Sequence, residues 1–128
     1  MARLTVLDAS ILLAHFDDTD PHTEAAEAIL ADADELVAST ITLAEVLVGA
    51  ARVGRLDEQL EALSVLKIKE LPIERGAAAQ LARLRAETGL RMPDCCVLHA
   101  ATVAGADAVA TRDERLSRVA AARGLQTP

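Results

Sequence analysis

The stretch LTVLDASILLAHF, residues 4–16, decides the fold class of this protein. Its first four residues are an apolar run with the β-branched pair Thr5-Val6, which predicts a short buried strand ending at Asp8. Residues 10–16 then have the apolar pattern of a helix. A buried strand followed at once by a helix is typical of proteins in which helices cover a parallel sheet.

The same alternation continues along the chain. We expect further strands at residues 36–38, 67–71 and 106–110, and further helices from Pro21 with Asp20 as its cap, from Thr40 or Thr42 to 52, at 56–66, at 75–88, from Pro93 to about 105 and at 112–123. Parallel strands need helical crossovers, so the pattern predicts an α/β protein of three layers, α/β/α, with a central, mostly parallel sheet of four to five short strands. No repeat or linker divides the sequence, and residues 1–128 are expected to form a single domain.

The composition excludes several classes of protein. Of the 128 residues, 52% are hydrophobic and 26% are charged, which is too apolar for a disordered chain and too charged for a membrane protein. The first apolar run is too short for a signal peptide or a spanning helix, so we expect a cytoplasmic protein without a membrane partner. Cys95 and Cys96 are sequence neighbours, which disfavours a disulfide or a zinc site and predicts small buried side chains. The net charge of −7 argues against a nucleic-acid partner unless a bound divalent cation or clustered arginines offset it. The single aromatic residue, Phe16, leaves no stacking platform for bases, so any binding of RNA must rest on backbone, shape and metal.

Four carboxylates fall where the predicted strands end or the following helices begin. Asp8 follows the first strand, Glu45 lies in the helix after the second, Asp94 opens the helix before the fourth, and Asp113 follows the fourth. In an open parallel sheet, strand carboxyl ends and helix N-termini share one edge, which is where ligands bind. We therefore expect these four side chains to lie near one another.

Each of these acids also has a purely structural interpretation. Thr42 to Glu45 and Thr111 to Glu114 match the capping-box pattern, and Asp8 and Asp94 suit the positive ends of helix dipoles. Four converging carboxylates, however, raise one another's pKa values and cost stability, whereas a divalent cation makes the cluster favourable. Oxygen ligands without a paired His or Cys indicate Mg²⁺ or Mn²⁺. Such ions catalyse the hydrolysis of phosphate esters by activating a water and polarising the phosphate.

The order of motifs resembles the PIN domain, and specifically the VapC-type toxins of VapBC toxin–antitoxin pairs. The four stretches that carry the resemblance are VLDAS (residues 6–10), TLAEVLVG (residues 42–49), MPDCCVLHAATV (residues 92–103) and ATRD (residues 110–113). The resemblance covers nearly the whole chain. It implies that Asp8, Glu45, Asp94 and Asp113 form the catalytic metal site and that Ser10, Thr42 and Thr111 support them.

The same resemblance implies an activity and its partners. It implies an Mg²⁺- or Mn²⁺-dependent endoribonuclease, the toxin of a type II toxin–antitoxin system, acting as a homodimer and inhibited by a VapB-like antitoxin. A basic antitoxin side chain against the acidic pocket would inhibit by replacing the cation. Candidates for contact with RNA are Arg91, Arg112 and Arg115, with Arg83 and Arg85 as further basic residues near that path.

Two alternatives remain open at this point. A haloacid-dehalogenase-like phosphatase would also place an acid after the first strand, but its motif needs a second Asp two residues later, where this chain has Ser10. A catalytically inactive α/β module that only binds a protein partner would use the acids as helix caps and surface charge. Dependence on metal separates this module from a nuclease.

Overall fold

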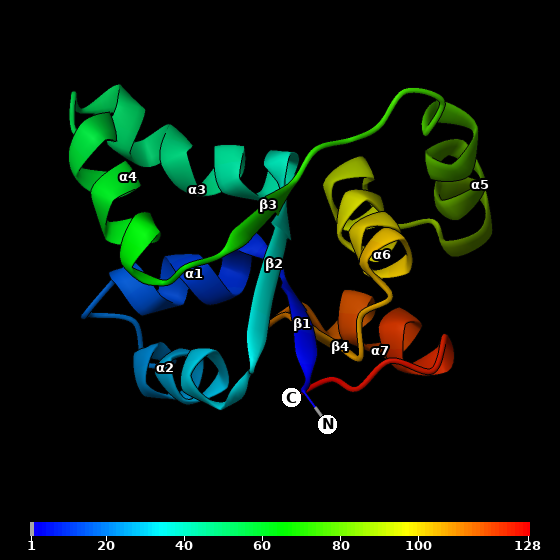
Figure 1. Cartoon of the computed structure of the whole chain (residues 1–128), viewed down its shortest axis with the longest axis horizontal. Coiled ribbons are helices and arrows are strands. Elements are labelled where there is room, and N and C mark those ends of the chain that lie inside the picture. The colour runs from blue at the N-terminus through cyan, green and yellow to red at the C-terminus, as the bar shows by residue number, and fades with distance from the viewer. Residues whose placement is uncertain (1) are drawn as a thin grey trace.

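The computed structural model describes residues 2–128 and contains one parallel sheet between two layers of helices (Figure 1). The elements follow one another as β1 (Leu4–Leu7), α1 (Ala9–Phe16), α2 (Thr23–Asp32), β2 (Glu35–Ser39), α3 (Thr40–Arg52), α4 (Leu56–Val65), β3 (Lys69–Leu71), α5 (Ala78–Thr88), α6 (Met92–Ala104), β4 (Ala108–Ala110) and α7 (Glu114–Ala122). The strand order is β3-β2-β1-β4, and all three strand pairs are parallel. The predicted α/β/α fold is confirmed.

Alternation along each strand divides the apolar core into two halves. Val6 packs with Val109 on one face, whereas Leu7 packs on the other face with Ala110. The first half lies under α5, α6 and α7, and the second lies under α1 to α4, as the two groups of helices in Figure 1 show. Successive side chains of a strand point to opposite faces, so a short apolar run buried on both sides needs helices on both sides.

Several helices begin later than the sequence predicts. The helix α2 starts at Thr23, because Asp20 accepts a hydrogen bond from His22 N at 2.8 Å in a turn that contains Pro21. The predicted helix start at Pro21 is therefore wrong. Local side-chain bonding by Asp is strong enough to compete with helix formation over one turn.

The caps of α3 and α7 also differ from the capping-box interpretation. Ser39 is the N-cap of α3, and its hydroxyl accepts from Ile41 N at 3.2 Å. Asp113 is the N-cap of α7 and accepts from Leu116 N at 3.0 Å. Thr42 lies inside α3 and Thr111 lies two residues ahead of its cap, so neither threonine closes a capping box.

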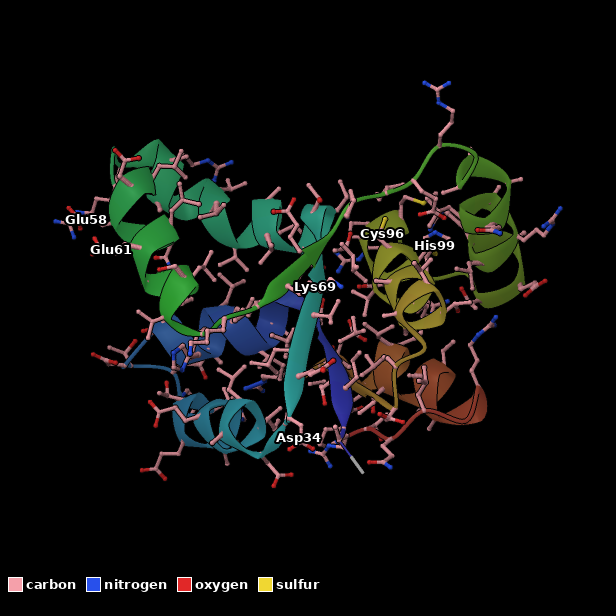
Figure 2. All side chains as sticks on the ribbon, in the orientation of Figure 1. Asp34, Glu58, Glu61, Lys69, Cys96 and His99 are labelled. Carbon is pink, nitrogen blue, oxygen red and sulfur yellow. The ribbon has the colours of Figure 1, made fainter. Side chains whose placement is uncertain are left out.

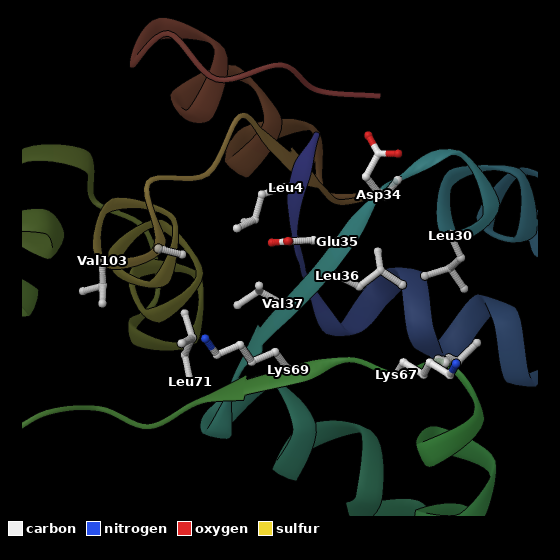
Figure 3. Close-up of a pocket in the computed structure, with 13 residues that line it drawn as sticks. Leu4, Leu30, Asp34, Glu35, Leu36, Val37, Lys67, Lys69, Leu71 and Val103 are labelled. Atoms are coloured by element: carbon white, nitrogen blue, oxygen red, sulfur yellow. The ribbon is translucent and has the colours of Figure 1, made fainter. Parts of the chain in front are cut away.

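A cavity of about 660 Å³ opens at the end of the sheet where β1 and β2 begin (Figure 3). Figure 3 shows hydrophobic side chains such as Leu36 and Val103 around it, together with Glu35 and the chain's two lysines, Lys67 and Lys69. None of the four predicted site acids lines it. Asp8 and Asp113 instead follow the carboxyl ends of β1 and β4, at the opposite edge of the sheet. Within residues 2–128, no helix is both long and apolar enough to cross a membrane.

Candidate active site

Asp8 is held between the ends of β1 and β4 by two hydroxyl groups. Its Oδ2 accepts from Ser10 Oγ and from Thr111 Oγ1, each at 2.7 Å, while its backbone N–H donates to Ala110 O at 2.9 Å. Asp8 has the position of the N-cap of α1, yet its side chain makes no capping bond. Two charge-assisted hydrogen bonds fix the carboxylate in place. The helix-cap interpretation does not account for this side chain.

The same two hydroxyls tie the Asp8 carboxylate to the loop after β4. Ser10 Oγ accepts from Arg112 N at 3.0 Å, and Thr111 Oγ1 accepts from Asp113 N at 3.0 Å. Each hydroxyl thus donates to Asp8 and accepts from a backbone N–H. This orientation leaves Asp8 Oδ1 without a hydrogen-bond donor among residues 2–128. A carboxylate with one oxygen held and the other free is suited to bind a cation.

Asp94 lies in the first turn of α6, and its side chain is mostly buried. Burial raises the pKa of Asp94, and the negative charges of Asp8 and Asp113 raise it further. Arg91 and Arg115 partly offset this rise. Because charges act on one another in this way only over short distances, the carboxylates after β1, after β4 and at the start of α6 share one region of the structure.

Glu45 belongs to the same region. It lies on α3, and burial raises its pKa, with further contributions from the negative charges of Asp8 and Asp94. The positive charge of Arg91 opposes these contributions. Asp8 and Asp94 thus act on Glu45, and Asp8 and Asp113 act on Asp94, so charge effects link the four sequence-predicted acids pairwise although they come from four separate segments.

The side chains as they stand do not form a closed ligand shell. Within residues 2–128, no three Asp, Glu, His or Cys side chains converge closely enough to hold one ion between them. The donor set itself fits Mg²⁺ or Mn²⁺, since it consists of carboxylate oxygens and includes the free Oδ1 of Asp8.

Thr42 lies one turn before Glu45 and is fully buried. Its hydroxyl has no hydrogen-bond partner within the described residues. A buried hydroxyl without a partner costs free energy, so such groups in folded proteins are commonly satisfied by water or a ligand. The sequence predicted a supporting position for Thr42, and the orphaned hydroxyl is compatible with it.

The predicted RNA-contacting arginines differ in how they are held. Arg112 lies 3.7 Å from Asp20, and Arg115 donates to the carbonyl of Thr88 at 3.4 Å, so both have partners within the chain. The pairing with Asp20 was not predicted, because the sequence indicated only a helix cap there. Arg91 points its Nε toward Asp94 Oδ2 at 3.8 Å.

The two cysteines beside Asp94 are buried, as predicted. Cys95 and Cys96 lie on α6 in the apolar core, and burial raises the pKa of both thiols. Figure 2 shows Cys96 and His99 on this helix, away from Asp34 at the start of β2. His99 Nε2 donates to Glu74 Oε1 at 2.8 Å and is not directed to the four acids. Neutral thiols in a closed apolar environment act as packing groups.

Comparison with known proteins agrees with this arrangement. The sequence matches the PIN domain family over residues 5–122. This chain belongs to the PIN domain family. The match includes every acid of the candidate site, from Asp8 to Asp113, and the predicted resemblance is confirmed.

Solved structures have the same PIN fold. A toxin–antitoxin complex from Klebsiella pneumoniae is similar with 28% identity and a TM-score of 0.70, over 85% of this chain and 86% of that one. VapC20 from Mycobacterium tuberculosis, a toxin that cleaves the sarcin–ricin loop, is similar with 14% identity and a TM-score of 0.74, over 90% and 94%. FitAcB from Neisseria gonorrhoeae is similar with 22% identity and a TM-score of 0.72, over 96% and 95%. No curated protein sequence has significant similarity to this PIN domain.

Proposed function

We propose that this PIN domain is the toxin of a type II toxin–antitoxin system and an Mg²⁺- or Mn²⁺-dependent endoribonuclease. The observation that carries the proposal is the Asp8 carboxylate at the carboxyl edge of the sheet, where Ser10 and Thr111 hold Oδ2 and leave Oδ1 free, together with the charge effects that link Asp8 to Glu45 and Asp94. A protein gathers like charges there at a cost in stability, and a divalent cation turns that cost into binding energy. The similarity to the Klebsiella toxin–antitoxin complex supports the same class of function.

The chain's own residues divide the task in the following way. Asp8, Glu45, Asp94 and Asp113 would hold the cation, which when bound activates a water and polarises the phosphate. Ser10 and Thr111 hold the Asp8 carboxylate through Oδ2, so the side chain would not have to change rotamer for Oδ1 to bind the cation. Pre-positioning of this kind lowers the entropic cost of binding.

The proposal includes a protein partner and a second copy of this chain. We expect a VapB-like antitoxin that covers the acidic edge with a basic side chain, and a homodimer in solution. Exposed apolar side chains supply contact area for such partners on α1, α3 and α4: Leu13, Val48, Leu56 and Leu60. A single domain over residues 1–128 acting in the cytoplasm is part of the same proposal.

The experiment is cleavage of total cellular RNA by the purified chain. Reactions contain Mg²⁺, Mn²⁺ or chelator, and compare the wild type with Asp8→Asn and with Asp18→Asn, a matched change at an exposed acid in the loop after α1. We expect discrete fragments that require metal and Asp8 and that persist in the Asp18 variant. Folded wild-type protein without metal-dependent cleavage would instead favour a protein-binding module.

A further inference from the structure

Arg91 lies beside Asp94 of the candidate site. It is the N-cap residue of α6, three positions before Asp94, and its side chain makes no capping bond. Its Nε lies 3.8 Å from Asp94 Oδ2. The side chain of Arg91 is 76% exposed, whereas that of Asp94 is 8% exposed. A solvent-exposed cation on a long stem thus reaches a carboxylate that is nearly enclosed.

The charge of Arg91 acts on more than one acid. It lowers the pKa of Glu45 on α3 as well as that of Asp94 on α6, against the larger effect of burial. Arg91 is therefore close enough to interact with the carboxylates of both Glu45 on α3 and Asp94 on α6. A guanidinium in this place neutralises part of the negative charge that the acids share.

Arg91 also differs from the other arginines near the site. The side chain of Arg112, paired with Asp20 at 3.7 Å, is only 29% exposed, and Arg115 donates to the Thr88 carbonyl at 3.4 Å. Within residues 2–128, the side chain of Arg91 has a single polar partner, the carboxylate of Asp94, and it is 76% exposed. At 3.8 Å the Nε–Oδ2 contact is longer than a hydrogen bond, and the guanidinium is largely solvated, so the cation can leave Asp94 at little cost.

We propose that Arg91 is a counter-ion that exchanges partners: it pairs with Asp94 in the cation-free protein and turns to an RNA phosphate once a divalent cation is bound. This inference rests on the proposed function. A guanidinium and a divalent cation repel each other and compete for Asp94 Oδ2. A phosphate brought to the cation offers the displaced guanidinium two oxygens in the fork geometry that it prefers.

Loss of the Arg91 charge should change the affinity for the cation and the affinity for RNA in opposite directions. Removing the positive charge should strengthen binding of the cation, because a competitor is gone. It should weaken binding of RNA, because a phosphate contact is lost. A residue that only stabilised the fold would weaken both or neither, so the pair of measurements separates the exchange from a structural effect.

The test compares four full-length proteins: the wild type, Arg91→Gln, Arg91→Lys and Arg118→Gln. Arg118 is an exposed arginine on α7 without an ion pair in the described residues, and it controls for the loss of one positive charge. Mn²⁺ affinity is measured by calorimetry at low and high ionic strength. RNA affinity is measured by fluorescence anisotropy with a mixed-sequence phosphorothioate RNA in the presence of Mn²⁺.

We expect Arg91→Gln to lower the Kd for Mn²⁺ by about two- to fivefold at low ionic strength, and the difference to shrink in high salt. The same variant should raise the Kd for RNA by about tenfold. Arg91→Lys should keep the wild-type Mn²⁺ affinity and recover RNA binding in part, and Arg118→Gln should leave the Mn²⁺ affinity unchanged.

An Arg91→Gln protein with unchanged or weaker Mn²⁺ affinity would overturn the exchange while leaving the proposed function intact. An equal gain in Arg118→Gln would also overturn it, since the effect would then be one of overall charge. If the wild type itself bound no Mn²⁺, the proposed function would fail, and the inference with it.

Discussion

The hydroxyl of Thr111 donates to Asp8 Oδ2 at 2.7 Å and so joins the residue after β4 to the residue after β1. These residues are 103 positions apart in the sequence, but β1 and β4 are neighbouring parallel strands in register from Thr5 and Ala108 onward. The hydroxyl accepts at the same time from Asp113 N. One side chain therefore sets the positions of two site acids.

Thr111→Val should test this connection. The substitution keeps the shape of the side chain and removes both hydrogen bonds, so we expect the free energy of unfolding to fall by about 1–2 kcal/mol and cleavage to decrease. Urea denaturation and the RNA assay measure the two effects. The control is Thr102→Val, where an exposed hydroxyl bonds only to a carbonyl of its own helix. Equal losses in the two variants would contradict the connection.

Asp94→Asn should separate activity from stability. The variant loses a charged cation ligand, and we expect cleavage to fall by about 100-fold or more. The metal-free protein should unfold with an equal or higher free energy, because repulsion from Asp8 and Asp113 is relieved. Thermal unfolding in chelator, beside the RNA assay, measures both. A variant with full metal-dependent cleavage would exclude Asp94 from the site.

The raised pKa values of Glu45 and Asp94 predict a definite pH dependence. The folded-state pKa lies above the ordinary value of 4.5 for Glu45 and of 3.8 for Asp94. At a pH between the ordinary and the folded-state pKa of either residue, the folded protein therefore binds more protons than the unfolded chain. This contribution to stability therefore grows as pH falls through that window and is lost as pH rises. Affinity for Mn²⁺ should fall over the same window, since protons compete with the cation.

The pH prediction is checked with Glu45→Gln. Urea denaturation of metal-free wild type and variant from neutral to mildly acidic pH gives the difference in free energy of unfolding at each pH. The free energy of unfolding of Glu45→Gln should exceed that of the wild type most at neutral pH. The difference should disappear as the pH falls to the ordinary pKa of 4.5 and below, because protonation makes the wild-type side chain neutral as well. A difference independent of pH would show that the charge of Glu45 is not responsible.

Gly89→Ala should disturb the loop that leads to Arg91 and Asp94. Gly89 has φ of +69°, and a Cβ there would lie 2.8 Å from Arg115 Nη2. We expect a loss of about 1 kcal/mol from the backbone conformation, with a further loss from displacing Arg115. Gly124→Ala, with φ of +86° and nothing within 4 Å of the added Cβ, isolates the backbone effect. Chemical denaturation of both variants gives the comparison, and equal losses would show that the contact with Arg115 is unimportant.

Cys95→Ala and Cys96→Ala should leave RNA cleavage largely unchanged. Both thiols are buried and have raised pKa values, which disfavours the thiolate needed for reaction. A modest loss of stability is expected from the smaller side chains. Complete loss of cleavage by either folded variant would contradict their assignment as packing residues.

Much of the fold was predictable because each signal is local. The apolar run before Asp8, the Gly89 helix end and Pro93 at the start of α6 act within a few residues of themselves. The start of α2 was less predictable, since bonding by Asp20 competes there with the helix. The caps of α3 and α7 were misread because Ser39 and Asp113 compete with equally suitable neighbours, Thr42 and Thr111.

The sequence by itself determined which side chains carry charge and at which end of each strand they fall, because strand direction and helix crossovers place those ends at one edge. Only the tertiary structure decided how the groups act on one another. Burial and proximity raise the pKa values of Glu45 and Asp94, and the same packing leaves the Arg91 side chain largely exposed beside Asp94, whereas Arg112 is half-buried beside Asp20. Desolvation and distance set these effects, and both depend on contacts between segments far apart in the chain.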